Sequence, residues 1–209
     1  MYPYIKRALD LVLATVLGIA LIPAFALIAL LIRLDSRGPV LFRQKRFGRN
    51  KGFFRLIKFR TMSVDAPHDK PTADLSDADR WITPVGRFLR RTSLDELPQI
   101  LNIWCGDMSF VGPRPALWNQ TALIAERDRY EGREGLTPNM LRPGLTGWAQ
   151  VNGRDLLNDA EKAALDGEYV RRMSFRFDLL CVWRTLRSVP SGTGVQEGGP
   201  GAAKGENSR

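Results

Sequence analysis

Two adjacent carboxylates, Asp95 and Glu96, stand in the segment RFLRRTSLDELPQ, residues 87–99, shortly after three arginines. A carboxylate has a pKa of about 4 in solution, so it is ionised at neutral pH and can act as a nucleophile without a base. Neighbouring carboxylates also suit Mg²⁺, which binds one or two of them together with substrate phosphates. The pair is therefore the first candidate for chemistry, and a solvated first turn of a helix is the structural alternative.

Arginines in two loops rich in glycine and proline supply the complementary charge. The loop GDMSFVGPRP carries Arg114, and the loop RPGLTGWAQVNGR carries Arg142 and Arg154. A guanidinium binds phosphate through two parallel hydrogen bonds, although each arginine alone fits an ordinary turn. The single histidine, His68, argues against a histidine-based triad or a His-rich metal site. Carboxylates and arginines together indicate phosphoryl-type transfer.

Positive charge is concentrated in the first third of the chain. Residues 1–62 contain twelve Lys and Arg against two acids, and the whole chain has a net charge of +9. Such asymmetry is typical of a nucleic-acid surface or of contact with an anionic membrane. The two cysteines, Cys105 and Cys181, lack CxxC spacing, which is typical of a reducing compartment.

An uncharged apolar run extends over 22 residues, from Leu11 to Ile32. A straight helix of this length would be about 33 Å long, enough to cross a bilayer. Pro23 at its centre removes a hydrogen bond and bends the helix. Basic residues flank both ends, so the positive-inside rule favours the cytoplasmic side for both. The sequence therefore predicts a re-entrant helix that enters the membrane, bends at Pro23 and returns.

Three other interpretations of this run stay open. A straight transmembrane helix tolerates one proline. A signal peptide ending at Ala26 matches the small-residue pattern of PAFA, but cleavage there leaves an apolar mature start, LIALLIR. A buried core helix would be unusual at this length and apolarity.

A strand is expected shortly after the apolar run. Residues 33–62 are predicted as a basic loop followed by the strand FFRLIKFR, in which Lys58 and Arg60 share one face. An exposed basic strand beside anionic lipid headgroups would have the same pattern.

Helices are expected further along the chain. Residues 81–91 are predicted to form a helix that carries Arg90 on a basic face. Residues 165–189 mix apolar and basic side chains along another expected helix. From Ser191 onward the chain has almost no apolar content, which predicts a disordered tail.

The acid pair is expected at a helix start, for which two arrangements fit. Ser93 and Glu96 match the S-x-x-E capping box, which would put Pro98 in the second turn. Capping by Asp95 would instead place Pro98 in the first turn, where its missing N–H costs nothing.

Taken together, these segments resemble the bacterial sugar transferases, the small monotopic phosphoglycosyl transferases that begin lipid-linked glycan assembly. The resemblance extends from about Lys6 to Val189 and rests on GPVLFRQKRFGRNKGFFRLIKFRTM, RTSLDELPQILNIWCGDMSFVGPRP and RPGLTGWAQVNGR. It implies a re-entrant membrane helix on a small, mixed, mostly helical α/β catalytic body at the cytoplasmic face of the bacterial inner membrane. The implied division is 1–36 for the membrane helix, 37–190 for the catalytic domain and 191–209 for the tail. One position differs, because Ile22 precedes the kinking proline where family members have serine.

The resemblance also implies the reaction. Asp95 would attack the sugar-bearing phosphate of a UDP-sugar and expel UMP, and polyprenyl (undecaprenyl) phosphate would then take the phosphosugar. Glu96 would assist by positioning or proton handling, and Mg²⁺, with Asp95 as a ligand, would neutralise the diphosphate. The residues expected to bind phosphate or substrate are Lys58, Arg60, Arg90, Arg114, Arg142 and Arg154. The expected partners are the UDP-sugar, polyprenyl phosphate and membrane lipid, without nucleic acid, and a homodimer is left open.

Two other classes of function remain. A membrane-anchored basic adaptor that binds anionic lipid accounts for the charge and the apolar run, but not for the acid pair or the GPRP loop. A nucleic-acid binder accounts for the charge alone. Replacement of Asp95 separates these classes, because it abolishes catalysis and leaves lipid or nucleic-acid binding nearly intact.

Overall fold

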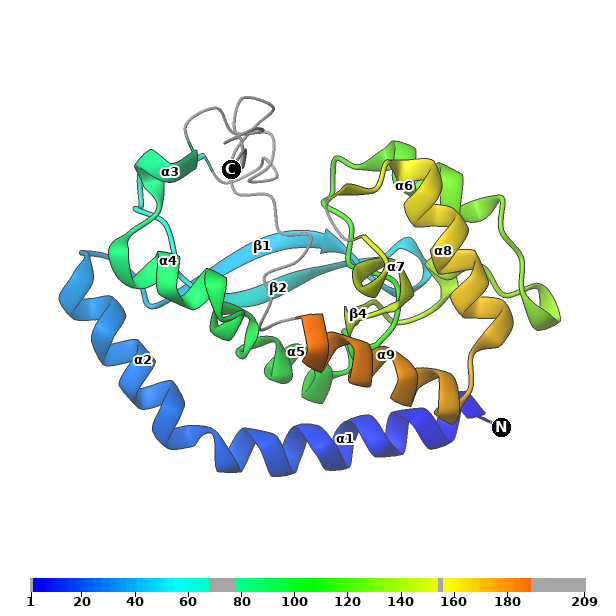
Figure 1. The fold of residues 1–209 in the computed structure, drawn as a ribbon, viewed down its shortest axis with the longest axis horizontal. Coiled ribbons are helices and arrows are strands. Elements are labelled where there is room, and N and C mark those ends of the chain that lie inside the picture. The colour runs from blue at the N-terminus through cyan, green and yellow to red at the C-terminus, as the bar shows by residue number, and fades with distance from the viewer. Residues whose placement is uncertain (1, 68–77, 154–155, 189–209) are drawn as a thin grey trace, which may run out of the picture.

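The computed structural model of the chain describes residues 2–67, 78–153 and 156–188 (Figure 1). Helices dominate and the described strands form two small sheets, so the predicted mixed, mostly helical α/β class is confirmed. The α-helices are α1 (Tyr2–Ala20), α2 (Ile22–Asp35), α3 (Ala78–Trp81), α4 (Pro84–Arg91), α5 (Gln99–Cys105), α6 (Thr121–Asp128), α7 (Trp148–Val151), α8 (Asp159–Arg172) and α9 (Phe175–Ser188). The 3-10 turns are η1 (Arg49–Lys51), η3 (Leu94–Glu96), η4 (Arg133–Gly135) and η5 (Pro138–Met140). Arg154 and the predicted tail lie outside the described residues.

The apolar run forms two helices, α1 and α2, whose axes differ by 60°. Leu21 is the N-cap of α2, and Pro23 lies in the first turn, where its missing N–H breaks no helical hydrogen bond. In one continuous helix the ring of Pro23 would clash with the carbonyl of residue 19. The predicted bend is therefore confirmed, with the break itself at Leu21.

The bent pair runs along one side of the body (Figure 1). Many of its apolar side chains are exposed. Tyr4, Ile19 and Leu34 are 83%, 65% and 76% exposed. No single helix within the described ranges has both the length and the apolarity to cross a bilayer; α1 and α2 meet that requirement only as a bent pair.

A basic antiparallel hairpin lies at the centre of the body. Strand β1 (Leu41–Phe47) pairs along its whole length with β2 (Phe53–Phe59). The strand predicted at the end of residues 33–62 is confirmed as β2. The basic loop predicted before it is wrong for residues 41–47, because these residues form β1. A second, parallel sheet joins β3 (Ser109–Val111) to β4 (Gly144–Thr146).

Two predicted helices are each divided in two. The helix expected at residues 81–91 is split into α3 and α4, because the Thr83 side chain caps α4 and Pro84 stands in its first turn. The helix expected at residues 165–189 is split into α8 and α9 by a turn at Met173.

Two apolar clusters fix the bent pair to the elements that carry the acids. Ala14 of α1 packs with Ile103 of α5 and with β2. Ile32 of α2 packs with Phe59 of β2 and Leu89 of α4.

The division of the chain into domains, with boundaries at residues 36 and 190, stays a prediction.

A buried amide fixes α5 to the outer edge of β2. Asn102 is 2% exposed, and its Oδ1 accepts a hydrogen bond from Ile57 N at 3.0 Å. Its Nδ2 donates to Arg55 O at 2.8 Å. These bonds satisfy groups that an edge strand otherwise leaves unpaired, so α5 takes the place of a third strand there.

Candidate active site

The acids occupy the 3-10 turn η3, between α4 and α5. Ser93 enters this turn with a left-handed φ of 56°, which reverses the chain after α4. Its side chain makes no capping hydrogen bond, so the predicted capping box is wrong. Capping by Asp95 is also wrong, because Pro98 is the N-cap of α5. Asp95 is only 9% exposed and Glu96 is half-buried, which excludes an ordinary solvated helix start.

A lysine from the hairpin lies against both carboxylates. Lys58 Nζ is 2.8 Å from Glu96 Oε1 and 3.8 Å from Asp95 Oδ2. The three side chains are 20%, 14% and 12% exposed, in the order Lys58, Glu96 and Asp95. The attraction between these charges is stronger here than in open water, because nearby protein lowers the local dielectric constant. Lys58 therefore offsets the repulsion between the adjacent acids.

The GPRP loop brings a second cation to the pair. Arg114 Nη2 is 3.7 Å from Glu96 Oε1, and the Arg114 side chain is 35% exposed. Prolines on both sides restrict the backbone of Arg114, since their φ angles are fixed. The guanidinium thus lies beside Glu96 and is more exposed to solvent than Lys58 or either acid.

A buried ion pair holds the backbone of this loop. Arg127 Nη2 donates to Arg114 O at 2.9 Å. The same guanidinium pairs with Asp166 Oδ2 at 2.6 Å, and the two side chains are 5% and 1% exposed. Burial raises the pKa of Asp166, and the Arg127 charge opposes this rise. Sequence reasoning missed both residues, which lie 39 positions apart in the chain.

Arg46 of β1 is a further cation that sequence reasoning missed. Its Nη1 donates to Pro115 O at 3.0 Å, and its Nη2 donates to Gln44 Oε1 at 2.6 Å. Burial, followed by the Arg114 charge, lowers the pKa of Arg46 to about 9, while Glu96 opposes the change. Arg46 stays charged at neutral pH and links the hairpin to the GPRP loop. Gln44 and Arg46 are two residues apart, so their side chains share one face of a strand; this spacing was the signal that the sequence offered.

The other predicted phosphate-binding residues do not contact the acid pair in the same way as Lys58 and Arg114. Arg60 is 6% exposed, and its guanidinium donates to Ser36 O at 2.8 Å and to Arg37 O at 2.7 Å, after the end of α2. Arg142 Nε donates to Gly106 O at 2.8 Å, after the end of α5. Arg90 is half-buried in the last turn of α4, a helix that packs against η3. The structure thus brings Lys58, Arg114 and the two acids together, and it places Arg60 and Arg142 away from them.

The acid pair fits a cation shared with substrate. Within the described ranges, His, Cys, Asp and Glu side chains form no group of three suited to a metal ion. Mg²⁺ keeps several waters and needs only one or two carboxylates besides substrate phosphates. Asp95 and Glu96 can supply those carboxylates, and Lys58 already provides one positive charge beside them.

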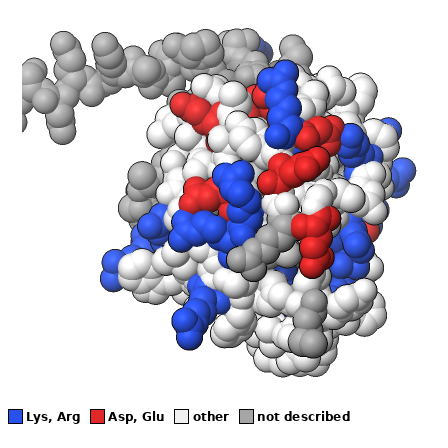
Figure 2. Space-filling view, turned by 90° about the vertical axis from the view of Figure 1, so that its right-hand side faces the viewer, with Lys and Arg blue, Asp and Glu red and all other residues white. Residues whose placement is uncertain are grey.

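Charge on the face at the right-hand side of Figure 1 is mixed. Figure 2 shows Lys and Arg side chains interspersed there with Asp and Glu. Coloured residues on this face do not form one unbroken basic surface of the kind that tracks a nucleic-acid backbone.

Comparisons with known proteins agree with these observations. A profile described as Bacterial sugar transferase matches residues 1–192. The chain is 43% identical over 191 residues to the UDP-glucose:undecaprenyl-phosphate glucose-1-phosphate transferase of Escherichia coli, covering 87% of this chain and 39% of that protein. It is 38% identical over 200 residues to the UDP-N-acetylgalactosamine-undecaprenyl-phosphate N-acetylgalactosaminephosphotransferase of Aeromonas hydrophila, covering 93% and 46%. It is 38% identical over 195 residues to the uncharacterized sugar transferase EpsL of Bacillus subtilis, covering 92% and 91%. The chain thus spans less than half of the first two relatives and nearly all of the third.

Removing Arg127 should destabilise the protein and disturb the GPRP loop. We expect Arg127→Met to lower the free energy of unfolding by about 3–5 kcal/mol, because Asp166 is left buried without its partner. The double variant Arg127→Met with Asp166→Leu should recover much of that loss. Arg129→Met, which breaks the exposed pair with Glu126, should cost less than about 1 kcal/mol. Denaturant unfolding in detergent measures all three, and equal stability of the single and double variants would contradict the role of the pair.

Proposed function

Because the chain belongs to the bacterial sugar transferase family, we propose that it transfers a sugar phosphate from a UDP-sugar to polyprenyl phosphate and releases UMP. The observation that carries this proposal is the enclosed acid pair, with Lys58 against both carboxylates and Arg114 beside Glu96. Relatives from Escherichia coli and Aeromonas hydrophila are named as undecaprenyl-phosphate sugar phosphotransferases that use UDP-sugars. A membrane-anchored adaptor would need no such enclosed acids.

The reaction begins with Asp95 as the nucleophile. One carboxylate oxygen attacks the phosphorus that bears the sugar, forming a mixed anhydride, while the bond to the UMP oxygen breaks and UMP leaves with that electron pair. A phosphate oxygen of polyprenyl phosphate then attacks the same phosphorus, and the Asp95 carboxylate is released. No proton has to be removed from Asp95, which accounts for a site built without histidine.

The neighbouring side chains position the donor and stabilise charge. Lys58 holds Glu96 in place and offsets the negative charge that accumulates as the diphosphate approaches. Arg114 offers a planar pair of N–H groups to a phosphate, and Arg90 supplies charge from the last turn of α4. When bound, Mg²⁺ would be held by Asp95 and Glu96 and would neutralise the diphosphate.

We place the bent pair as a re-entrant segment in the bacterial inner membrane, with the body at the cytoplasmic face. The exposed apolar side chains of α1 and α2 support this placement, since a core helix would bury them. Basic residues at both ends of the pair favour the same side of the membrane for each end.

Asp95→Asn should abolish a half-reaction that needs no lipid acceptor. The parent protein, given Mg²⁺ and its UDP-sugar, should release UMP in a burst stoichiometric with active sites and then stop, because the phosphosugar stays on Asp95. Intact-mass spectrometry should detect the adduct, and Asp95→Asn should lose both burst and adduct. Asp79→Asn, an exposed carboxylate paired with Arg87, is the matched control and should behave as the parent. A sugar donor that turns over with lipid but gives no acceptor-free UMP would overturn the covalent mechanism.

Arg114→Lys tests whether this residue is a bidentate ligand or only a charge. Lysine keeps the charge but loses the planar fork, so we expect turnover to fall at least about tenfold. Thermal unfolding should stay close to that of the parent, because the Arg114 carbonyl still accepts from Arg127. Near-normal turnover would mean that Arg114 acts only as a point charge.

Thiol labelling in intact cells tests the re-entrant topology. Single cysteines at Tyr4 and Arg43, with Cys105 replaced by Ala, should both resist a membrane-impermeant reagent and react after permeabilisation. Cys181 can stay, because burial raises the pKa of its thiol to about 12 and keeps it unreactive. Pro23→Leu should increase outside labelling at position 4, since the bend loses its cause. Outside labelling of position 4 in the parent would establish a straight span instead.

A further inference from the structure

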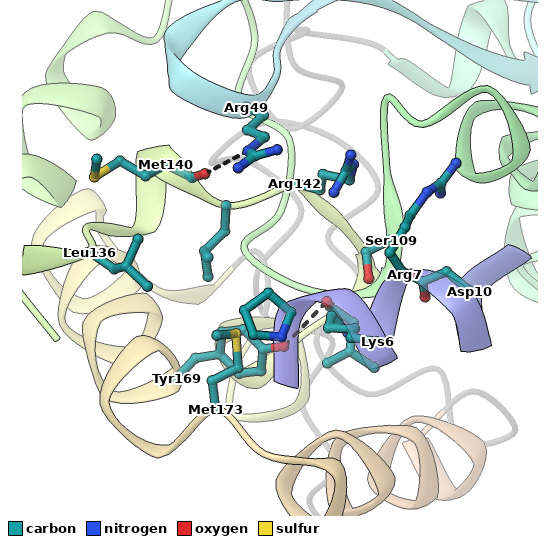
Figure 3. Close-up of a pocket in the computed structure, with 13 residues that line it drawn as sticks. Lys6, Arg7, Asp10, Arg49, Ser109, Leu136, Met140, Arg142, Tyr169 and Met173 are labelled. Carbon is teal, nitrogen blue, oxygen red and sulfur yellow. Dashed lines mark hydrogen bonds between the residues drawn. The ribbon is translucent and has the colours of Figure 1, made fainter. Parts of the chain in front are cut away.

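A cavity of about 110 Å³ lies at the far end of α5 from the acids (Figure 3). Arg7 Nη1 and Arg142 Nε bond there to the carbonyls of Ile103 and Gly106, at 2.6 Å and 2.8 Å. Asp95 precedes the other end of this helix, whose seven residues span about 10 Å along its axis. The cavity has room for several water molecules or one phosphate-sized group, and it is separate from the proposed catalytic pair.

Cations from distant parts of the chain line this cavity. They are Lys6, Arg7, Arg49 and Arg142. Lys6 is neutralised by Asp178 at 2.5 Å. Among the described residues that line the cavity, Asp10 is the one carboxylate that faces the three arginines, and its Oδ1 accepts from Phe110 N at 3.1 Å. Burial first, and then the Arg49 and Arg7 charges, lower the pKa of Arg142, while Asp10 opposes the change. The arginines therefore repel one another and leave a net positive cavity.

Within the part of the chain that the structure describes, the terminal nitrogens of two of these arginines are not used by the protein. Arg49 donates from Nε to Met140 O at 3.3 Å, and Arg142 donates from Nε to Gly106 O. Among the described residues, their Nη atoms have no hydrogen-bond partner. Each Nε bond fixes a guanidinium at the edge of the cavity and leaves its planar pair of N–H donors available.

A buried hydroxyl adds an independent indication of a ligand. Ser109 is 1% exposed and lines the cavity, and its Oγ has no hydrogen-bond partner among the residues that the structure describes. Buried hydroxyls are nearly always paired, because an unpaired one loses its bonds to water without replacement. A tetrahedral anion beside Arg142 would accept from this hydroxyl as well.

We propose that this cavity binds a phosphate group through Arg49, Arg142 and Ser109. The first turns of α1 form one wall, and apolar side chains, including Leu136 and Met173, line much of the remainder. A phosphate attached to a larger organic group that contacts these apolar side chains fits this combination. Two sources share that chemistry, the headgroup of an anionic phospholipid and the phosphate of a free nucleotide. The predicted phosphate contact of Arg142 is thereby assigned to a second site, whose occupancy does not depend on the proposed transfer reaction.

The test uses the full chain, purified in detergent and carrying Arg114→Met so that the catalytic arginine contributes less binding. One arm titrates inorganic phosphate and UMP and follows thermal unfolding at constant ionic strength. A second arm counts retained phosphatidylglycerol and phosphatidylcholine by native mass spectrometry. We expect Arg142→Gln to weaken binding at least about tenfold, because a charge-assisted bond is lost. Arg129→Gln, a matched exposed arginine, should bind as its background does.

Ser109→Ala separates a ligand contact from a structural role. Without ligand, this variant should be as stable as its background or more stable, since an unpaired buried hydroxyl is removed. With ligand, its binding should be about threefold weaker or worse, as expected when one neutral hydrogen bond is lost. A merely structural hydroxyl would leave binding unchanged, which would remove Ser109 from the site.

The two arms also identify the source. One phosphatidylglycerol molecule bound to the background and to Arg129→Gln, but not to Arg142→Gln, supports a lipid headgroup. Stabilisation by inorganic phosphate or UMP with the same dependence on Arg142 supports a free phosphate. Absence of binding in both arms, or equal weakening by Arg142→Gln and Arg129→Gln, overturns the proposal.

Discussion

The contact between Asn102 and the outer edge of β2 fixes the geometry on which the acid site depends. The amide bonds to Ile57 N and Arg55 O, and Lys58 is the next residue along that strand. A two-stranded hairpin is marginal in water and has two unpaired edges. Because α5 is bonded to this edge, the position of its first turn along β2 is fixed relative to Lys58. The acids immediately before α5 therefore meet the lysine, although the two segments are 38 positions apart.

Each charged group at the site is held by a different structural support. Lys58 depends on the hairpin edge, Asp95 depends on the left-handed turn at Ser93, and Arg114 depends on the carbonyl bond from Arg127. Such supports matter for phosphoryl transfer, because a catalytic dipole or charge stabilises a transition state well only when it is already oriented. Adjacent acids repel one another and would turn apart in a flexible loop. Enclosure beside Lys58 holds both carboxylates next to one ammonium group.

The sequence was informative wherever the determining chemistry is local. The acid pair, the bend around Pro23 and the strand that contains Lys58 depend on neighbouring residues, and the structure contains all three. The preceding strand was missed because it pairs only when the hairpin closes. Arg127 and Asp166 looked like ordinary helix residues, since their pairing follows from how α6 packs on α8. Residue type also could not show that Arg60 bonds to carbonyls after the end of α2, away from the acid pair.

In the proposed function, the bend between α1 and α2 links the position of this helix pair in the membrane to the geometry of the acid site. α1 is fixed near its start by Lys6 to Asp178 and by Arg7 to the end of α5, whereas α2 is fixed near its end by the bonds from Arg60. Polar bonds thus hold the two outer ends of the pair to the body, and the outward side chains around the bend stay apolar and exposed. A straight helix could not satisfy both ends at once. In the proposed function, the 60° angle would set how deeply the pair lies in a bilayer, and with it the height of the acids relative to the lipid acceptor.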